Sequence, residues 1–177
     1  KDQKFVEVLC DKNKIPLYVK KFDIFRASRF LKKGVEETSR LFRRRFFESV
    51  QKKTKSKKIL LAHHSDDQLE TFFMRLLRGS SLKGLQSMKA DEGLYLRPLL
   101  HVSKSEITDF LVSENIQWIE DETNTWDRYT RNNIRKNLIP ILEKFNPNLN
   151  STISNTIKLI GKQNSYIESH IETIEPS

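Results

Sequence analysis

The chain has 177 residues, 37% of them hydrophobic, which is enough for one domain with a buried core and for part of a second. It lacks both an apolar run near the roughly 18 residues of a membrane span and the apolar core of a secretion signal, and its only cysteine is Cys10, so we predict a cytoplasmic protein that does not enter a membrane. The net charge is +9, and residues 26–58 alone carry 13 Lys/Arg against 3 Asp/Glu, which predicts either a polyanion partner or a solvated helix face.

Hydrophobic periodicity predicts a mixture of helices and strands in the first half of the chain. The expected elements are the end of a helix at Phe5–Cys10, a strand from Ile15 to Ile24, a helix from Val35 to Val50, a lysine-rich loop from Lys52 to Lys58, and a short buried strand from Ile59 to Ala62. Ser65, Asp66 and Asp67 then cap a helix whose apolar stripe ends at Gly79.

The second half is expected to be mostly helical after one extended segment. The expected elements are an extended segment at Gly93–Pro98, a helix capped by Ser103, a loop from Trp118 to Tyr129, a helix from Arg131 to Phe145, and an amphipathic helix over residues 149–174. Pro140 is expected either to bend the helix from Arg131 to Phe145 or to lie at a junction within it. Together these elements indicate an α/β protein.

The stretch LAHHSDDQLE, residues 61–70, crowds ionisable groups at the expected strand-to-helix junction. Ligands of open α/β sheets bind at the carboxyl ends of the strands, which is where this stretch lies. Asp67 and Glu70 are spaced i, i+3 near a helix start, so they can hold Mg²⁺, grip an ammonium group, or simply complement the helix dipole. His63 and His64 are adjacent and point to opposite sides of an extended chain, which argues against a zinc site.

Two further stretches combine cations with small or polar residues. MRLLRGSSLKGL, residues 74–85, places Arg78 beside a Gly/Ser loop that either approaches a phosphate closely or only caps a helix. DRYTRNNIRKNLIP, residues 127–140, mixes arginines and asparagines with an aromatic residue, a combination that contacts RNA or forms a helix-capping network.

Several stretches resemble the tRNA(Ile)-lysidine synthetases of the PP-loop ATP pyrophosphatase group. They are LAHHSDDQLETFFMRLLRGSSLKGLQSM (61–88), RPLL (97–100), WIEDETNTWDRYTRNNIRKNLIPILEKFNP (118–147) and, more weakly, GVEETSRLFRRRFF (34–47). The resemblance implies a partial parallel-sheet PP-loop domain, of the adenine nucleotide alpha hydrolase-like kind, over residues 1–145. The start of a helical second domain, or a linker helix, would follow over residues 146–177.

The resemblance also implies an activity and its residues. The enzyme would use ATP and Mg²⁺ to adenylate the wobble cytidine of a CAU-anticodon tRNA(Ile), and free lysine would then displace AMP to form lysidine; a homodimer is one oligomeric state left open. By position, the catalytic residues would be Asp67, Glu70 and Arg43. Substrate or nucleotide would be bound by His63, His64, Asp66, Arg40 and Arg78. The tRNA would be bound by Arg44, Arg45, Arg128, Arg131, Arg135 and Lys136.

One part of the family pattern has no counterpart here. The family's ATP loop, S-G-G-x-D-S, is not matched, and the glycines at 34, 79, 84, 93 and 161 are all isolated from one another. We therefore expect that loop in a segment preceding Lys1. Two alternatives stay open, a tRNA-binding remnant without catalysis and a metal-dependent hydrolase that uses His63, His64, Asp66 and Asp67.

Overall fold

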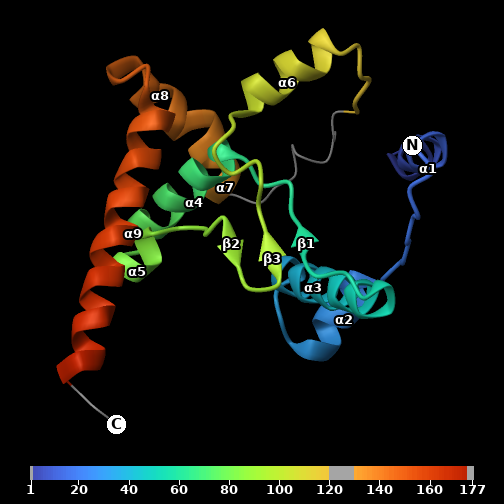
Figure 1. The fold of residues 1–177 in the computed structure, drawn as a ribbon, viewed down its shortest axis with the longest axis horizontal. Helices are drawn as coiled ribbons and strands as arrows, with labels where there is room; N and C mark the ends of the chain where they lie inside the picture. Colours follow the sequence, from blue (N-terminus) through green and yellow to red (C-terminus); the bar gives the residue numbers. More distant parts are fainter. Residues whose placement is uncertain (1, 120–129, 175–177) are drawn as a thin grey trace. The chain divides into compact units, whose positions relative to one another are not determined.

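The computed structural model describes residues 2–119 and 130–174, which divide into two compact units (Figure 1). Unit 1 consists of residues 1–60 and 93–96, and unit 2 of residues 61–92 and 97–177.

Unit 1 is built on a long basic helix. Its elements are α1 (Asp2–Lys12), α2 (Ile24–Leu31), α3 (Val35–Thr54), β1 (Ile59–Leu60) and β3 (Tyr95–Leu96). Helix α3 has acidic residues in its first turn and lysines in its last, an arrangement that the helix dipole favours. The ring of Phe22 packs edge-on against Phe42 at a centroid distance of 5.1 Å, which ties the segment before α2 to α3.

The predicted strand from Ile15 to Ile24 is wrong. Residues 15–23 are irregular, and Ile24 begins α2, where the carboxylate of Asp23 accepts a hydrogen bond from the backbone N–H of Arg26 at 2.9 Å. An alternating pattern makes a strand only when a neighbouring strand pairs with it. Within the described part of the chain no strand pairs with this segment, and Ile15 and Val19 are 57% and 50% exposed.

The sheet has three short strands in the order β1-β3-β2, where β2 is Asp91–Glu92. Strands β1 and β3 are parallel, with Ile59 opposite Tyr95 and Leu60 opposite Leu96. The predicted strand over residues 59–62 is thus confirmed in place, but it is shorter than expected, and the prediction that it is buried is wrong because Leu60 is 65% exposed.

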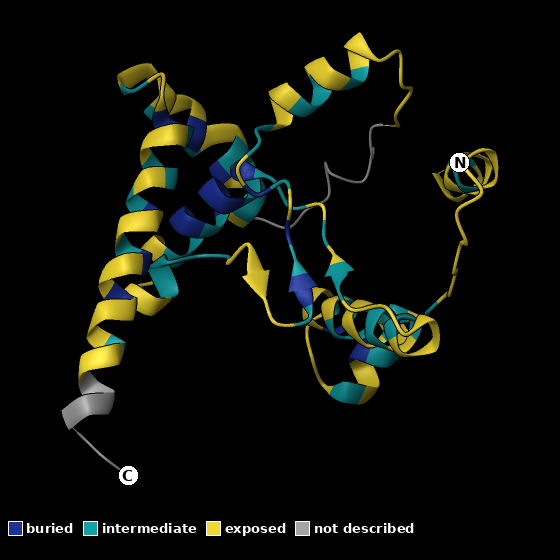
Figure 2. Ribbon diagram, viewed as in Figure 1, coloured by how far each residue is buried: buried dark blue, intermediate teal, exposed yellow. Residues whose placement is uncertain are grey.

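Unit 2 is helical. Its helices are α4 (Ser65–Leu77), α5 (Leu82–Leu85), α6 (Lys104–Ser113), α7 (Thr130–Asn133), the π-helical turn η2 (Ile134–Leu138), α8 (Ile139–Phe145) and α9 (Leu149–Ile174). Helix α9 runs along α4 and α5, and the buried residues gather on the facing sides (Figure 2). The core consists of Leu69, Phe72, Phe73, Ile134, Ile139, Leu149 and Ile157.

The predicted helix starts in unit 2 are largely confirmed. Ser103 caps α6 and forms a capping box with Glu106, as Ser and Glu three residues apart do. The break at Asn146–Asn148 separates α8 from α9, as predicted. The predicted loop over Trp118–Tyr129 falls mostly on residues 120–129, outside the described residues.

The helix predicted over Arg131–Phe145 is not a single α-helix, and Pro140 lies at a junction, which is one of the two predicted alternatives. It contains η2, in which the backbone N–H of Ile139 donates to the carbonyl of Ile134, and Pro140 follows at the start of α8. Proline cannot donate a backbone hydrogen bond, and its ring crowds the carbonyl four residues earlier, so the α-helical pattern is interrupted at this point.

Candidate functional site

The start of α4 is fixed by contacts with two other segments of unit 2. The backbone N–H of Ser65 donates to the carbonyl of Val102 at 2.9 Å, and the side-chain amide of Asn150 donates to Ser65 Oγ at 3.1 Å. Ser65 is only 5% exposed, so these bonds are shielded from water. The helix start, and the polar residues around it, therefore have a defined position within unit 2.

His64 lies between two carboxylates at this helix start. Its Nδ1 is 3.3 Å from Asp66 Oδ2, its Nε2 is 3.5 Å from Asp67 Oδ2, and its backbone N–H donates to Asp67 Oδ2 at 3.1 Å. The hydrogen bond to Asp66, with the negative charges of Asp67 and Glu70 nearby, raises the pKa of His64 although burial opposes the shift. The carboxylates around His64 therefore stabilise the protonated form of its imidazole.

Asp66 connects the starts of two helices. Its Oδ2 accepts a hydrogen bond from the backbone N–H of Lys104, the first residue of α6, at 2.8 Å. Burial alone would raise the pKa of Asp66, but the hydrogen bonds from His64 and Lys104 outweigh it, so the pKa is lowered and the carboxylate stays charged.

Glu70 is held by two arginines from a distant part of the chain. Its side chain is 1% exposed, with Oε2 2.9 Å from Arg131 Nε and Oε1 2.5 Å from Arg135 Nε. Arg131 also donates to Thr71 Oγ1 at 3.3 Å. The side chains of Arg131 and Arg135 remain 34% and 40% exposed, so part of each arginine side chain reaches solvent. Asp67 and Glu70 therefore have different partners, although the i, i+3 spacing predicts a shared face.

The loop after α4 is pinned by two side chains of that helix. Gln68 is buried and makes two hydrogen bonds with the backbone of Met88, one to its carbonyl and one from its N–H, each at 2.8 Å. Arg75 donates to the carbonyls of Gly84 and Ser87 at 2.5 and 3.2 Å. These contacts support the helix-capping interpretation of the Gly/Ser loop, since its backbone faces α4.

Two glycines shape this loop for different reasons, Gly79 by its backbone conformation and Gly84 by close packing. Gly79 ends α4 with a φ of +72°, a conformation that favours glycine. At Gly84 an added Cβ would lie 2.9 Å from the Cβ of Ser80, so no side chain fits there without a shift.

The predicted arginines of unit 1 lie on α3. Arg40, Arg43, Arg44 and Arg45 are all exposed. Arg44 Nε is 3.0 Å from Glu48 Oε1, and its guanidinium lies 5.1 Å from the ring centroid of Tyr95. The Tyr95 hydroxyl donates to Glu48 Oε1 at 2.9 Å, and burial together with this hydrogen bond raises the pKa of Tyr95. The side chains of β3 therefore order one arginine of the basic helix.

The predicted site residues thus fall into separate groups. In unit 2 the structure brings His64, Asp66 and Asp67 together, and it brings Glu70 together with Arg131 and Arg135. His63 is half-buried, whereas Arg78 and Lys136 are exposed on the surface of unit 2. Arg128 lies outside the described residues. The contacts of Gln68, Arg75 and Tyr95 were not predicted, because their partners lie far along the chain and no local pattern marks them.

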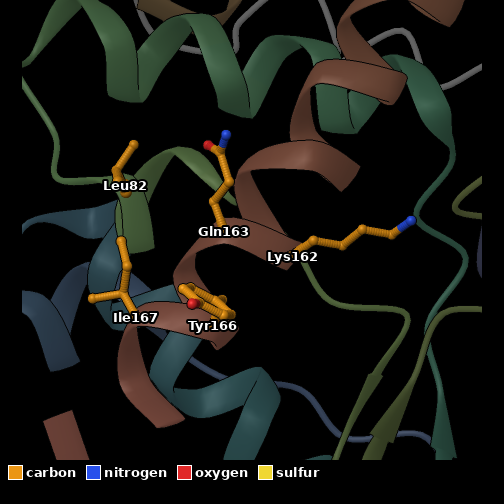
Figure 3. A pocket seen from close by; sticks show the side chains of 5 residues that line it. All are labelled: Leu82, Lys162, Gln163, Tyr166 and Ile167. Carbon is orange, nitrogen blue, oxygen red and sulfur yellow. The ribbon is translucent and has the colours of Figure 1, made fainter. Parts of the chain in front are cut away.

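Two hollows lie on the surface of unit 2. One, of about 530 Å³, is an open apolar hollow beside α5 and α9, and none of the predicted site residues lines it (Figure 3). The other, of about 320 Å³, is lined by polar side chains, among them Ser65, His101 and Lys158, and borders the start of α4.

Comparison with known sequences places the chain in a family. Residues 1–142 match the family described as "PP-loop domain". The chain belongs to the PP-loop domain family. The match confirms the predicted fold class and the predicted relationship to PP-loop proteins.

The relatives of this PP-loop domain are longer proteins. It is 33% identical to the tRNA(Ile)-lysidine synthase of Chlorobaculum tepidum, over 98% of this chain and 53% of that protein. It is 34% identical to the tRNA(Ile)-lysidine synthase of Clostridium acetobutylicum, over 95% of this chain and 37% of that protein. The bifunctional protein TilS/HprT of Listeria monocytogenes is 40% identical over 83% of this chain and 23% of its own length. The chain therefore spans about half, or less, of the length of these relatives.

Membrane-spanning helices and metal-ligand clusters are both absent from the described residues. None of the helices in residues 2–119 and 130–174 is long and apolar enough to cross a membrane. Within the same ranges, no group of three or more His, Cys, Asp or Glu side chains is placed to hold a metal ion. The metal-dependent hydrolase alternative therefore gains no ligand set from this part of the chain.

Proposed function

We propose that this chain is part of a cytoplasmic enzyme that ligates lysine to the wobble cytidine of a CAU-anticodon tRNA(Ile). The observation that carries the proposal is the alignment of 95–98% of the chain with proteins named tRNA(Ile)-lysidine synthase. The charged cluster at the start of α4 and the basic helix α3 supply the types of group that such a reaction needs.

The proposed reaction has two steps, adenylation of cytidine and displacement of AMP by lysine. The C2 oxygen of cytidine attacks the α-phosphorus of ATP, so an O–P bond forms and diphosphate leaves. The neutral ε-amine of lysine then attacks C2, a C–N bond forms, and AMP leaves with the former C2 oxygen while the amine loses its proton. Both steps require negative charge to be stabilised on phosphate, and the second step also requires the lysine ammonium to be bound and deprotonated.

The acidic residues would bind the lysine ammonium or hold other side chains of the site in position. Asp67, whose side chain is 17% exposed, would accept hydrogen bonds from the lysine ammonium, with His63, His64 and Asp66 lining the substrate or nucleotide site. Glu70 is enclosed by Arg131 and Arg135, so we assign it a positioning role through these arginines rather than contact with substrate.

The basic residues would act on phosphate and RNA. Arg40 and Arg43 would face the nucleotide or the target cytidine, and the exposed cations of α3 and α7–η2 would bind the tRNA backbone. Magnesium would enter with ATP as its substrate complex.

The test is lysine incorporation by the product of the complete reading frame. We expect it to transfer radiolabelled lysine to tRNA(Ile) with a CAU anticodon, with ATP converted to AMP and diphosphate. Asp67→Asn should abolish the transfer, whereas Asp109→Asn, a matched change at an exposed position of α6, should leave it unchanged. Binding of tRNA without any transfer would instead favour the non-catalytic alternative, and full activity of D67N would remove the role proposed for that residue.

A further inference from the structure

The segment from Thr130 to Phe145 presents two sets of side chains to two different neighbours. Arg131 and Arg135 contact Glu70, while Ile134 and Ile139 are both buried in the core of unit 2. The arginines are four residues apart, which suits one face of an α-helix. The isoleucines are five residues apart, and in a continuous α-helix they would point about 140° away from each other.

The π-helical turn reconciles these two spacings. In η2 the backbone N–H of Ile139 donates to the carbonyl five residues earlier, on Ile134, so one extra residue is accommodated in the turn. The two isoleucines then share a face. A continuous α-helix would have to give up either the burial of Ile139 or the contact of the arginines with Glu70, because one part would rotate by about 100° against the other.

Pro140 weakens the α-helical alternative. An α-helix through this point would need an N–H at position 140 to donate to the carbonyl of Lys136, but proline has no N–H and its ring crowds that carbonyl. The π-type hydrogen bond from Ile139 is made by the preceding residue and is not affected. The proline therefore favours the π turn by penalising its competitor.

We propose that Pro140 and η2 act together as a positioning device for the arginine pair. They hold the angular register at which Arg131 and Arg135 meet Glu70 and direct their exposed surfaces, 34% and 40% of each side chain, toward a phosphate-bearing ligand. The identity of that ligand as tRNA rests on the proposed function, whereas the register does not.

The experiment compares three variants of the chain. Pro140→Ala restores the α-helical alternative and should loosen the register. A Pro140→Ala variant from which the exposed Asn137 is also deleted brings the isoleucines to a four-residue spacing, so that a plain α-helix serves both faces. Pro147→Ala removes a proline from the loop between α8 and α9 and is the matched control.

The first readout measures the contact itself and needs no RNA. In the parent and in P147A, Glu70→Gln should lower the midpoint of urea unfolding. In P140A most of this effect should be lost, because Glu70 no longer meets both arginines, and in the deletion variant it should return. An undiminished effect of Glu70→Gln in P140A would overturn the proposal. If Pro140 only stabilised the chain in general, the deletion variant, which also lacks this proline, would not recover the contact.

The second readout is the dissociation constant for tRNA(Ile) with a CAU anticodon. P140A should bind about tenfold more weakly, as expected for losing one or two phosphate contacts, and the deletion variant should recover. Equal affinity of P140A and P147A would overturn the link from register to ligand. If the parent chain and the complete protein both failed to bind this tRNA, the proposed function would fail, while the unfolding experiment would still decide the register.

Discussion

Substitution of Glu70 by Gln tests the most enclosed charge of the candidate site. The change keeps the size of the side chain and removes the negative charge from between Arg131 and Arg135. Breaking a fully buried ion pair costs roughly 3–5 kcal/mol, because the remaining charge is left without a partner. Here the arginine side chains are 34% and 40% exposed, so water can solvate them in part, and we expect a loss of about 2 kcal/mol.

The assay is thermal and urea unfolding followed by circular dichroism. For a chain of this size a loss of about 2 kcal/mol corresponds to a fall of roughly 4–8 °C in Tm. Glu143→Gln, at an exposed position on α8, is the matched control and should stay within about 0.5 kcal/mol of the parent. A double-mutant cycle between Glu70→Gln and Arg135→Gln should show a coupling of about 1 kcal/mol. If Glu70→Gln were as stable as Glu143→Gln, or if the cycle showed no coupling, the interpretation of Glu70 as the centre of a stabilising charge cluster would be refuted.

Three further predictions concern stability. Gly84→Ala places a Cβ against Ser80 and should cost about 1–3 kcal/mol in urea unfolding, whereas Gly34→Ala, which meets nothing within 4 Å, should cost only about 0.5 kcal/mol, because Ala is a weaker N-cap of α3 than Gly; equal effects would contradict the packing argument. Folding raises the pKa of His64 above its usual 6.5, so protonated His64 stabilises the folded state fully below pH 6.5, and this stabilisation is lost as the pH rises through the raised pKa. The Tm of the parent should therefore fall relative to that of His64→Gln as the pH rises over this range, and a constant difference would exclude a stabilising contact between His64 and the carboxylates. Tyr95→Phe keeps the ring beside α3 but removes the hydrogen bond to Glu48, so it should destabilise by about 1 kcal/mol; this can be measured in the same urea assay, and an unchanged midpoint would show that the bond contributes nothing.

Local signals in the sequence predict the helices of this protein better than its strands. The caps at Asp23 and Ser103 use hydrogen bonds over three residues, so the chemistry that starts α2 and α6 is contained in the local sequence. The cap at Asp23 was nevertheless overlooked, because the alternating residues before it indicated a strand. That pattern becomes a strand only with a pairing partner, which a local pattern cannot supply.

The acidic cluster lies at the predicted start of a helix after a strand, but the contacts that its side chains make were not predicted. The i, i+3 spacing of Asp67 and Glu70 describes a helix surface, whereas their environments are decided by what packs against it. Asp67 is bonded to its neighbour His64, and Glu70 is bonded to arginines 61 and 65 positions away. The π turn was missed for a related reason, since the five-residue spacing of two isoleucines is recognisable only once both are known to be buried in one core.

The two hydrogen bonds of Gln68 have a consequence for how the chain tolerates change. A side-chain amide offers the same donor and acceptor as a peptide group, so Gln68 gives Met88 the paired bonds that a neighbouring strand would provide. The chain leaving the Gly/Ser loop is thereby fastened to α4 just before β2. The position of Met88, and of the residues that follow it, is therefore set by its contact with α4 and not by the number of residues in the loop. An insertion next to the exposed Gly79, in the loop before α5, should therefore bulge outward without shifting the residues that follow Met88.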